Sequence, residues 1–158
     1  MDTHEIEVVD NGLIHFFRKI SLPLAHIAIF VVFFWFGILK VFGDSPANPL
    51  VAKLLEQTLP FITFDQFIML FGIYEMIIGL AFLIPGLERL AIALLLPHMV
   101  TTVMPLILLS SITWQAPFVP TLEGQYIIKN IVIIALALSL AAHLHPMRIR
   151  HKKLHTHA

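Results

Sequence analysis

The sequence predicts an all-α fold: a transmembrane four-helix bundle with a short amphipathic interfacial helix between the first and second spans. Composition is the first reason, because 58% of the 158 residues are hydrophobic and 13% are charged, with a mean hydropathy of +0.89. A soluble domain carries about 25% charged residues and could not hide this much hydrocarbon from water. The second reason is that four apolar runs each reach about 20 residues, the length a helix needs to cross a bilayer core of about 30 Å. These runs are continuous, whereas the strands of a membrane barrel alternate.

We expect the spans at about 21–42, 64–84, 90–112 and 125–143, in a single membrane domain 1–158 with tails at 1–20 and 144–158. The first span follows an acidic leader and lacks a small-residue cleavage site, so it is not predicted to be a cleaved signal peptide. A tight Pro85-Gly86 connection joins the second and third spans. Before the fourth span, the segment 113–124 is predicted to be an interfacial loop anchored by Trp114.

The connection between the first two spans is longer and has a pattern of its own. A turn-forming cluster, Asp44-Ser45-Pro46-Ala47-Asn48-Pro49, ends the first helix. After it, apolar residues recur at helical spacing with polar residues between them: Leu50, Val51, Leu54, Leu55 and Leu59. This pattern predicts a short amphipathic helix at the membrane surface.

Charge sets the expected orientation and excludes some partners. Basic residues precede the first span and follow the last one: Arg18, Lys19, Arg148, Arg150, Lys152 and Lys153. Both termini are therefore predicted to be cytoplasmic. Ten basic and ten acidic residues cancel, so no nucleic-acid partner is expected. The absence of Cys excludes disulfide and thiolate chemistry within the chain. For the histidines of the C-terminal tail, a solvated basic segment near lipid headgroups is favoured over a metal site.

Ionisable side chains within the spans need a partner, because each costs about 2.5–3.5 kcal/mol at mid-membrane on insertion scales. Glu75 and His98 fall near the middle of the second and third spans. At 100° per residue, each helix carries its polar and small residues on one stripe, and the four stripes are expected to face inward. The predicted intramembrane polar pocket consists of Lys40, Glu75, His98, Thr101, Thr102, Lys129 and Asn130.

Several interpretations of this pocket remain open. Lys40 or Lys129 is the expected partner of Glu75, and His98 is the next candidate. The residues either form a buried ion pair that fixes packing, or a site that binds a redox headgroup or relays protons. His26 and His98 are candidate ligands of a haem, although two hydrogen-bonded bundle histidines are the favoured interpretation. The aromatic cluster 30–36 lines a quinone pocket in one interpretation and faces lipid in the favoured one.

Three segments of the chain carry a family resemblance. They are Phe34-Trp35-Phe36-Gly37-Ile38-Leu39-Lys40-Val41-Phe42, Gly72-Ile73-Tyr74-Glu75-Met76-Ile77-Ile78-Gly79-Leu80 and Tyr126-Ile127-Ile128-Lys129-Asn130. With four helices over about 150 residues, the chain resembles the DoxX-like superfamily of small membrane proteins. The likeness covers about residues 20–142 and is closest to the YkgB/RclC-like branch, where a segment of the Asn48-Pro49-Leu50-Val51-Ala52 type follows the first helix.

This resemblance implies a multi-pass protein of the bacterial inner membrane that is linked to respiration, quinone reduction or oxidative stress. It marks Lys40, Glu75 and Lys129 as shared positions without giving them a catalytic role. The chain departs from the branch in having no Cys and a shorter loop after Lys40, so thiol chemistry would come from a partner subunit.

The expected function is that of a redox- or respiration-associated membrane subunit whose pocket takes a quinone-like molecule or a proton. The alternative is a non-catalytic scaffold or accessory subunit of a larger complex. A small transporter is a third hypothesis, disfavoured because the chain shows no broken-helix repeat. Small-residue faces such as Gly72/Gly79 suit homo-oligomer contacts as well as contacts within the chain.

Overall fold

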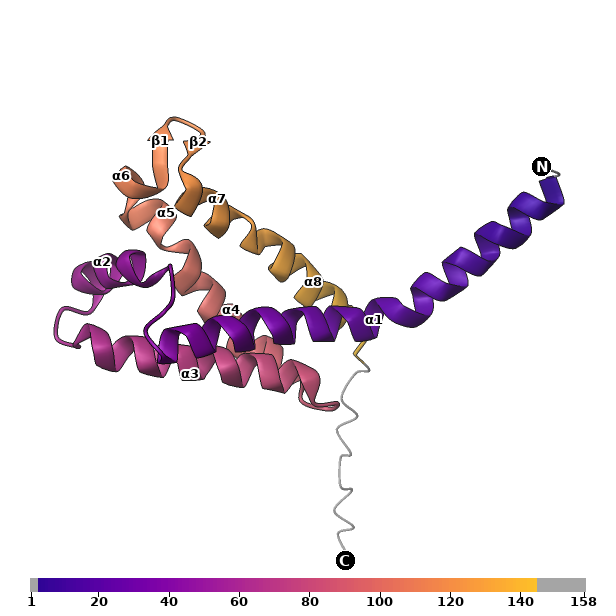
Figure 1. Cartoon of the computed structure of the whole chain (residues 1–158), viewed down its shortest axis with the longest axis horizontal. Coiled ribbons are helices and arrows are strands. Elements are labelled where there is room, and N and C mark those ends of the chain that lie inside the picture. The colour runs from indigo at the N-terminus through magenta and orange to yellow at the C-terminus, as the bar shows by residue number, and fades with distance from the viewer. Residues whose placement is uncertain (1–2, 145–158) are drawn as a thin grey trace, which may run out of the picture.

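The computed structural model describes residues 3–144 and confirms a mostly helical fold with four helical stretches long and apolar enough to cross a membrane (Figure 1). The stretches are Glu5–Val41, Phe64–Leu83, Glu88–Leu108 and Leu122–Ala142. The first lies in helix α1 (Thr3–Val41) and the second is helix α3 (Phe64–Leu83). By these lengths and their composition, the chain is an integral membrane protein with four spans.

Helix α1 begins at Thr3, well before the expected start of the first span at about residue 21. Charged residues interrupt the apolar run before residue 21, which predicts a tail there, but the segment 3–20 belongs to α1 and continues the helix without a break. It projects away from the rest of the fold (Figure 1). The C-terminal tail from residue 145, with most of its histidines and its basic residues, lies outside the described residues.

The third and fourth spans are each divided into shorter helices. The third contains α4 (Glu88–Val103) and α5 (Pro105–Leu108) and is followed by the short helix α6 (Ser110–Thr113). The fourth contains α7 (Leu122–Ile128) and α8 (Asn130–Ala142). Pro105 explains the first division, because its nitrogen has no hydrogen to donate to the carbonyl four residues earlier. No proline lies at the division between α7 and α8, where Lys129 separates the two helices.

The connections are more ordered than expected. The predicted amphipathic helix is present as α2 (Asn48–Thr58), in which Lys53 and Glu56 are exposed and Leu55 is buried. The predicted loop before the fourth span contains a hairpin of β1 (Trp114–Ala116) and β2 (Val119–Pro120), which pair antiparallel. The indole nitrogen of Trp114 donates to a backbone carbonyl, that of Leu106, over 3.0 Å.

The closest helix contact is between α1 and α3, where two glycines face the opposite backbone. A Cβ added to Gly72 would lie 2.7 Å from the carbonyl oxygen of Gly37, too close for any real side chain. Glycine at both positions therefore lets the two backbones approach, as at other membrane helix crossings. The apolar core continues from this contact with buried residues of α1, α3, α4 and α8: Ala25, Ile29, Phe33, Ile78, Ala81, Phe82, Ala91, Leu95, Met99, Ala137 and Leu140.

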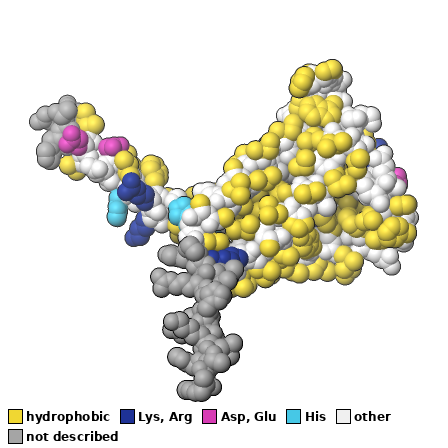
Figure 2. All heavy atoms as spheres, turned by 180° about the vertical axis from the view of Figure 1, so that it is seen from behind, with side chains coloured by type: hydrophobic (Ala, Val, Ile, Leu, Met, Phe, Trp, Pro, Cys, Tyr) yellow, Lys and Arg dark blue, Asp and Glu magenta, His cyan; other side chains and the backbone are white. Residues whose placement is uncertain are grey.

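Helix α7 begins beside the hairpin, away from the α1–α3 pair (Figure 1). Helix α8 comes close to that pair only at its C-terminal end (Figure 1). The buried residues of α8, Ala137 and Leu140, belong to that end. Hydrophobic side chains cover most of the visible outer surface (Figure 2). In a bilayer this surface faces hydrocarbon and needs no further cover.

Candidate functional site

Glu75 is the centre of a buried polar site between α1, α3 and α4. Its side chain lies near the middle of α3, while Lys40 belongs to the last turn of α1 and His98 to α4. The Lys40 Nζ donates to Glu75 Oε2 over 2.7 Å. The His98 Nε2 lies 2.9 Å from Glu75 Oε1, so each carboxylate oxygen has its own partner. The exposed fractions of Lys40, Glu75 and His98 are 6%, 5% and 4%.

The second ring nitrogen of His98 also has a partner. The Thr102 hydroxyl oxygen lies 3.3 Å from His98 Nδ1, and it also lies 2.9 Å from the His98 backbone oxygen. Thr101 makes only the second kind of bond, donating to the His98 backbone oxygen over 2.7 Å. We call Lys40, Glu75, His98 and Thr102 the Glu75 network. Each ring nitrogen of His98 thus faces a group that can accept a hydrogen bond.

Aromatic rings enclose the imidazole. Phe71 stacks on His98 with ring centroids 5.0 Å apart and an interplanar angle of 10°. Phe33 meets the same ring edge-on at 5.2 Å, and Tyr74 lies at 6.1 Å. The Lys40 Nζ is 5.7 Å from the centre of the Phe71 ring, within the range of a cation–π contact. These rings exclude water, so the charge interactions of the network are stronger than they would be at a surface.

The crossing of α1 and α3 positions the ion pair. A Cβ on Gly72 would lie 3.0 Å from the Cβ of Lys40, so the lysine starts directly opposite this glycine. Glu75 follows Gly72 by three residues, which places both on the same side of α3. The short backbone distance lets the Lys40 side chain reach the carboxylate from the end of its helix.

The structure brings together only part of the predicted pocket. Lys40, Glu75, His98 and Thr102 meet, and Thr101 lies beside them on α4. Of the two lysines proposed as the partner of Glu75, Lys40 is therefore the one that contacts it.

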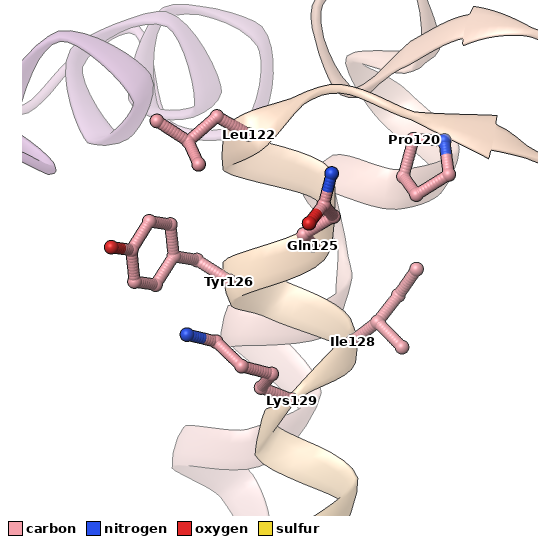
Figure 3. A pocket seen from close by; sticks show the side chains of 6 residues that line it. All are labelled: Pro120, Leu122, Gln125, Tyr126, Ile128 and Lys129. Carbon is pink, nitrogen blue, oxygen red and sulfur yellow. The ribbon is translucent and has the colours of Figure 1, made fainter.

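Lys129 and Asn130 belong to another part of the fold. The Lys129 ammonium lies 3.9 Å from the centre of the Tyr126 ring and is exposed. It lines a hollow of about 320 Å³ together with Pro120, Leu122, Gln125, Tyr126 and Ile128 (Figure 3). Asn130 is half-buried at the start of α8. Sequence periodicity predicts which face of the fourth span carries Lys129 and Asn130. It does not predict how far the fourth span lies from the other helices.

The two candidate haem ligands have separate protein partners. His26 Nδ1 lies 2.6 Å from the carbonyl oxygen of Phe82, and His98 contacts Glu75 and Thr102 through its two ring nitrogens. For His98 to bind iron, one of those contacts would have to break. Within residues 3–144, no group of three or more His, Cys, Asp or Glu side chains is arranged to hold a metal ion.

The aromatic residues around His98 were only partly expected. Phe33 belongs to the cluster considered for a quinone pocket and is buried, whereas Trp35 and Phe36 of that cluster are exposed. Phe71 and Tyr74 contact His98 but are not part of the predicted pocket. Phe71 precedes Glu75 by one helical turn, so its spacing places it on the same face of the helix. Tyr74 is the direct neighbour of Glu75, and residues at that spacing do not share a helix face, so periodicity gives no signal for it.

No known protein family, curated protein or solved structure matches this chain. The class of protein is therefore defined by the fold and the site alone: a four-span integral membrane protein with a buried Lys–Glu–His site. The resemblance to the DoxX-like superfamily is not confirmed by these comparisons and depends on the sequence segments that suggested it.

Proposed function

We propose that this protein is a redox- or respiration-associated membrane subunit in which the Glu75 network takes up and releases a proton within the bilayer. The observation that carries the proposal is the position of His98 between a carboxylate and a hydroxyl, one at each ring nitrogen. Ionisable groups at membrane depth are expensive, and paired Glu and His side chains there are typical of proton relays. The resemblance to DoxX-like proteins supports the link to respiration.

The hydrogen bonds of His98 are compatible with two protonation states. In the neutral ring, Nε2–H donates to Glu75 and Nδ1 accepts from the Thr102 hydroxyl. When Nδ1 gains a proton, it donates to the Thr102 oxygen, and the hydroxyl hydrogen turns to the His98 backbone oxygen. Both states keep each ring nitrogen bonded, so proton uptake requires the rotation of one hydroxyl rather than a rearrangement of helices.

A quinone-like molecule is the proposed consumer or source of this proton, because reduction of a quinone to a quinol takes up two electrons and two protons. The electrons would come from a partner subunit. Of two hollows in the fold, one lies beside Lys129 and one between α2 and the start of α3, and neither is lined by a residue of the Glu75 network. The geometry therefore supports a proton site more strongly than a headgroup site at Glu75 itself.

The test compares two threonines on one helix. We propose to label the histidines of the reconstituted protein with nitrogen-15 and to follow the His98 ring resonances across pH in Thr102→Val and Thr101→Val variants. Both variants lose a bond to the same backbone oxygen, but only the Thr102 variant loses the group facing Nδ1. We expect reversible titration of His98 in the parent protein and in Thr101→Val, and an altered titration in Thr102→Val. Resonances that stay constant with pH in the folded parent protein would contradict the proposal.

A non-catalytic scaffold is the second candidate function, favoured by how completely the network is enclosed. Both side chains of the Lys40–Glu75 pair are 7% exposed. In a scaffold, Glu75→Gln lowers stability while any complex with partner subunits remains functional. Organic extraction of the purified protein adds an independent result, because a stoichiometric quinone would support the redox role over the scaffold.

A further inference from the structure

The N-terminal arm, residues 6–20 of α1, is an amphipathic helix whose apolar face is largely exposed among residues 3–144. Apolar residues recur along it at spacings that share one arc about 100° wide: Ile6, Val9, Leu13, Phe16, Phe17 and Ile20. The opposite side of the helix carries Glu7, Asn11, His15, Arg18 and Lys19, with Val8 and Ile14 beside them, and Asp10 borders the apolar arc. Val9, Leu13 and Phe17 are 55%, 49% and 58% exposed, although they lie on the apolar arc.

The arm is too long and too charged to be part of the span. The apolar stretch Glu5–Val41 has 37 residues, which extend about 55 Å at about 1.5 Å per residue, against a hydrocarbon thickness of about 30 Å. The part of α1 that follows Lys19 is sufficient to cross by itself. Arg18 and Lys19 mark where the chain leaves the hydrocarbon, because basic residues at this position place their charges among the headgroups.

A proline in α1, close to Arg18 and Lys19, can bend the helix where the arm meets the span. Pro23 lies inside α1 and cannot donate to the carbonyl four residues earlier, which is a common cause of a kink. The axis of α1 bends where the arm leaves the part packed on α3 (Figure 1). In the view from behind, the arm carries its basic, acidic and histidine side chains well apart from the apolar bulk of the bundle (Figure 2).

We propose that the N-terminal arm lies in the membrane interface, with its apolar arc in the acyl-chain boundary and its polar face among headgroups and water. The apolar face of the arm contacts the lipid surface. The reason is that the arm is continuous with the first span and joins it at Arg18 and Lys19, which mark the border between hydrocarbon and headgroups. If the arm extended into water, its whole apolar arc would be exposed to water. If the arm crossed the hydrocarbon, its charged side chains would be buried there. An interfacial position avoids both costs.

The chain is suited to a direct test because it contains no Cys. Single substitutions Val9→Cys and Leu13→Cys on the apolar arc, and Asn11→Cys and His15→Cys on the polar face, each place one spin label at an exposed position. Val132→Cys on α8 is the matched hydrocarbon control, since it is exposed near the middle of the fourth span. The labelled full chain is reconstituted in lipid nanodiscs, and collisions with oxygen and with a water-soluble nickel chelate are measured.

We expect the labels at positions 9 and 13 to collide several-fold more with oxygen than with the nickel chelate, as at position 132. The labels at positions 11 and 15 should show the reverse preference. Equal nickel accessibility at all four positions would place the arm in water and overturn the proposal. Exclusion of both reagents from positions 9 and 13 would also overturn it, because it would show that the arc packs on protein, such as a second copy of the chain.

Discussion

The Lys40–Glu75 ion pair makes a quantitative prediction about stability. Its nitrogen–oxygen distance is 2.7 Å and both side chains are 7% exposed, so solvent screens the pair little. Removal of one member of a buried pair leaves the other charge without compensation and costs about 3–5 kcal/mol. We therefore expect Lys40→Met and Glu75→Gln each to destabilise the fold by about this amount.

The double variant should be more stable than either single variant. With Lys40→Met and Glu75→Gln combined, no unpaired charge remains, and the glutamine oxygen can still accept the bond from His98. This order of stabilities requires a coupling energy between the two sites, measured as the departure from additivity, that exceeds the larger single-variant cost of about 3–5 kcal/mol. Equilibrium unfolding of the reconstituted protein by steric trapping, or by SDS in mixed micelles, gives the four free energies.

Lys53 and Glu56 of α2 provide the control pair. Both are exposed, and Lys53→Met and Glu56→Gln should each change stability by no more than about 0.5 kcal/mol and should add. A coupling between Lys40 and Glu75 below about 0.6 kcal/mol, the average for ordinary interhelical hydrogen bonds in a membrane, would refute the reasoning. The network would then not depend on this ion pair.

Three further predictions concern packing and the remaining polar residues. Gly72→Ala should destabilise the fold by about 1–3 kcal/mol, because its methyl group would lie 2.7 Å from the backbone of α1. In thermal unfolding in detergent, Gly12→Ala should not destabilise, since nothing lies within 4 Å of a Cβ there. Lys129→Met should change the unfolding free energy by less than about 0.5 kcal/mol, and a loss as large as that of Lys40→Met would show that the fourth span reaches the network. Thr113→Val should cost about 1 kcal/mol in the same unfolding assay, because this fully buried hydroxyl bonds to two backbone carbonyls, and no loss would mean that those bonds contribute nothing.

The spans and part of the site followed from physical rules that act locally. Continuous apolar length identifies membrane helices because unpaired backbone groups cannot exist in hydrocarbon. The cost of a charge at mid-membrane singled out Glu75 and His98, and helical spacing placed Thr102 on the face of His98. These expectations need no knowledge of which helices are neighbours.

The choice between Lys40 and Lys129 could not be made in this way. Helical periodicity gives the face of each span but not its distance from the others, and the fourth span diverges from the α1–α3 pair. The glycines of α1 and α3 were visible, yet small residues suit contacts with any neighbour, including a second chain. The start of α1 at Thr3 was missed for another reason: the apolar run decides where a span begins, whereas a helix can extend beyond it.

The distance of 35 sequence positions from Lys40 to Glu75 has a consequence for how the protein is made. Translation delivers the amino-terminal span first, so its lysine reaches the insertion machinery before the carboxylate has been synthesised. A lysine at the end of a helix can enter the bilayer before its partner is present, because its long side chain reaches the headgroups. A glutamate in the middle of a span cannot reach them and needs its partner at once. Helix α3, which carries Glu75, would therefore enter the bilayer most readily beside α1, which carries Lys40. The neutralised charges would then hold the two spans together as a helical hairpin before the third and fourth spans are inserted.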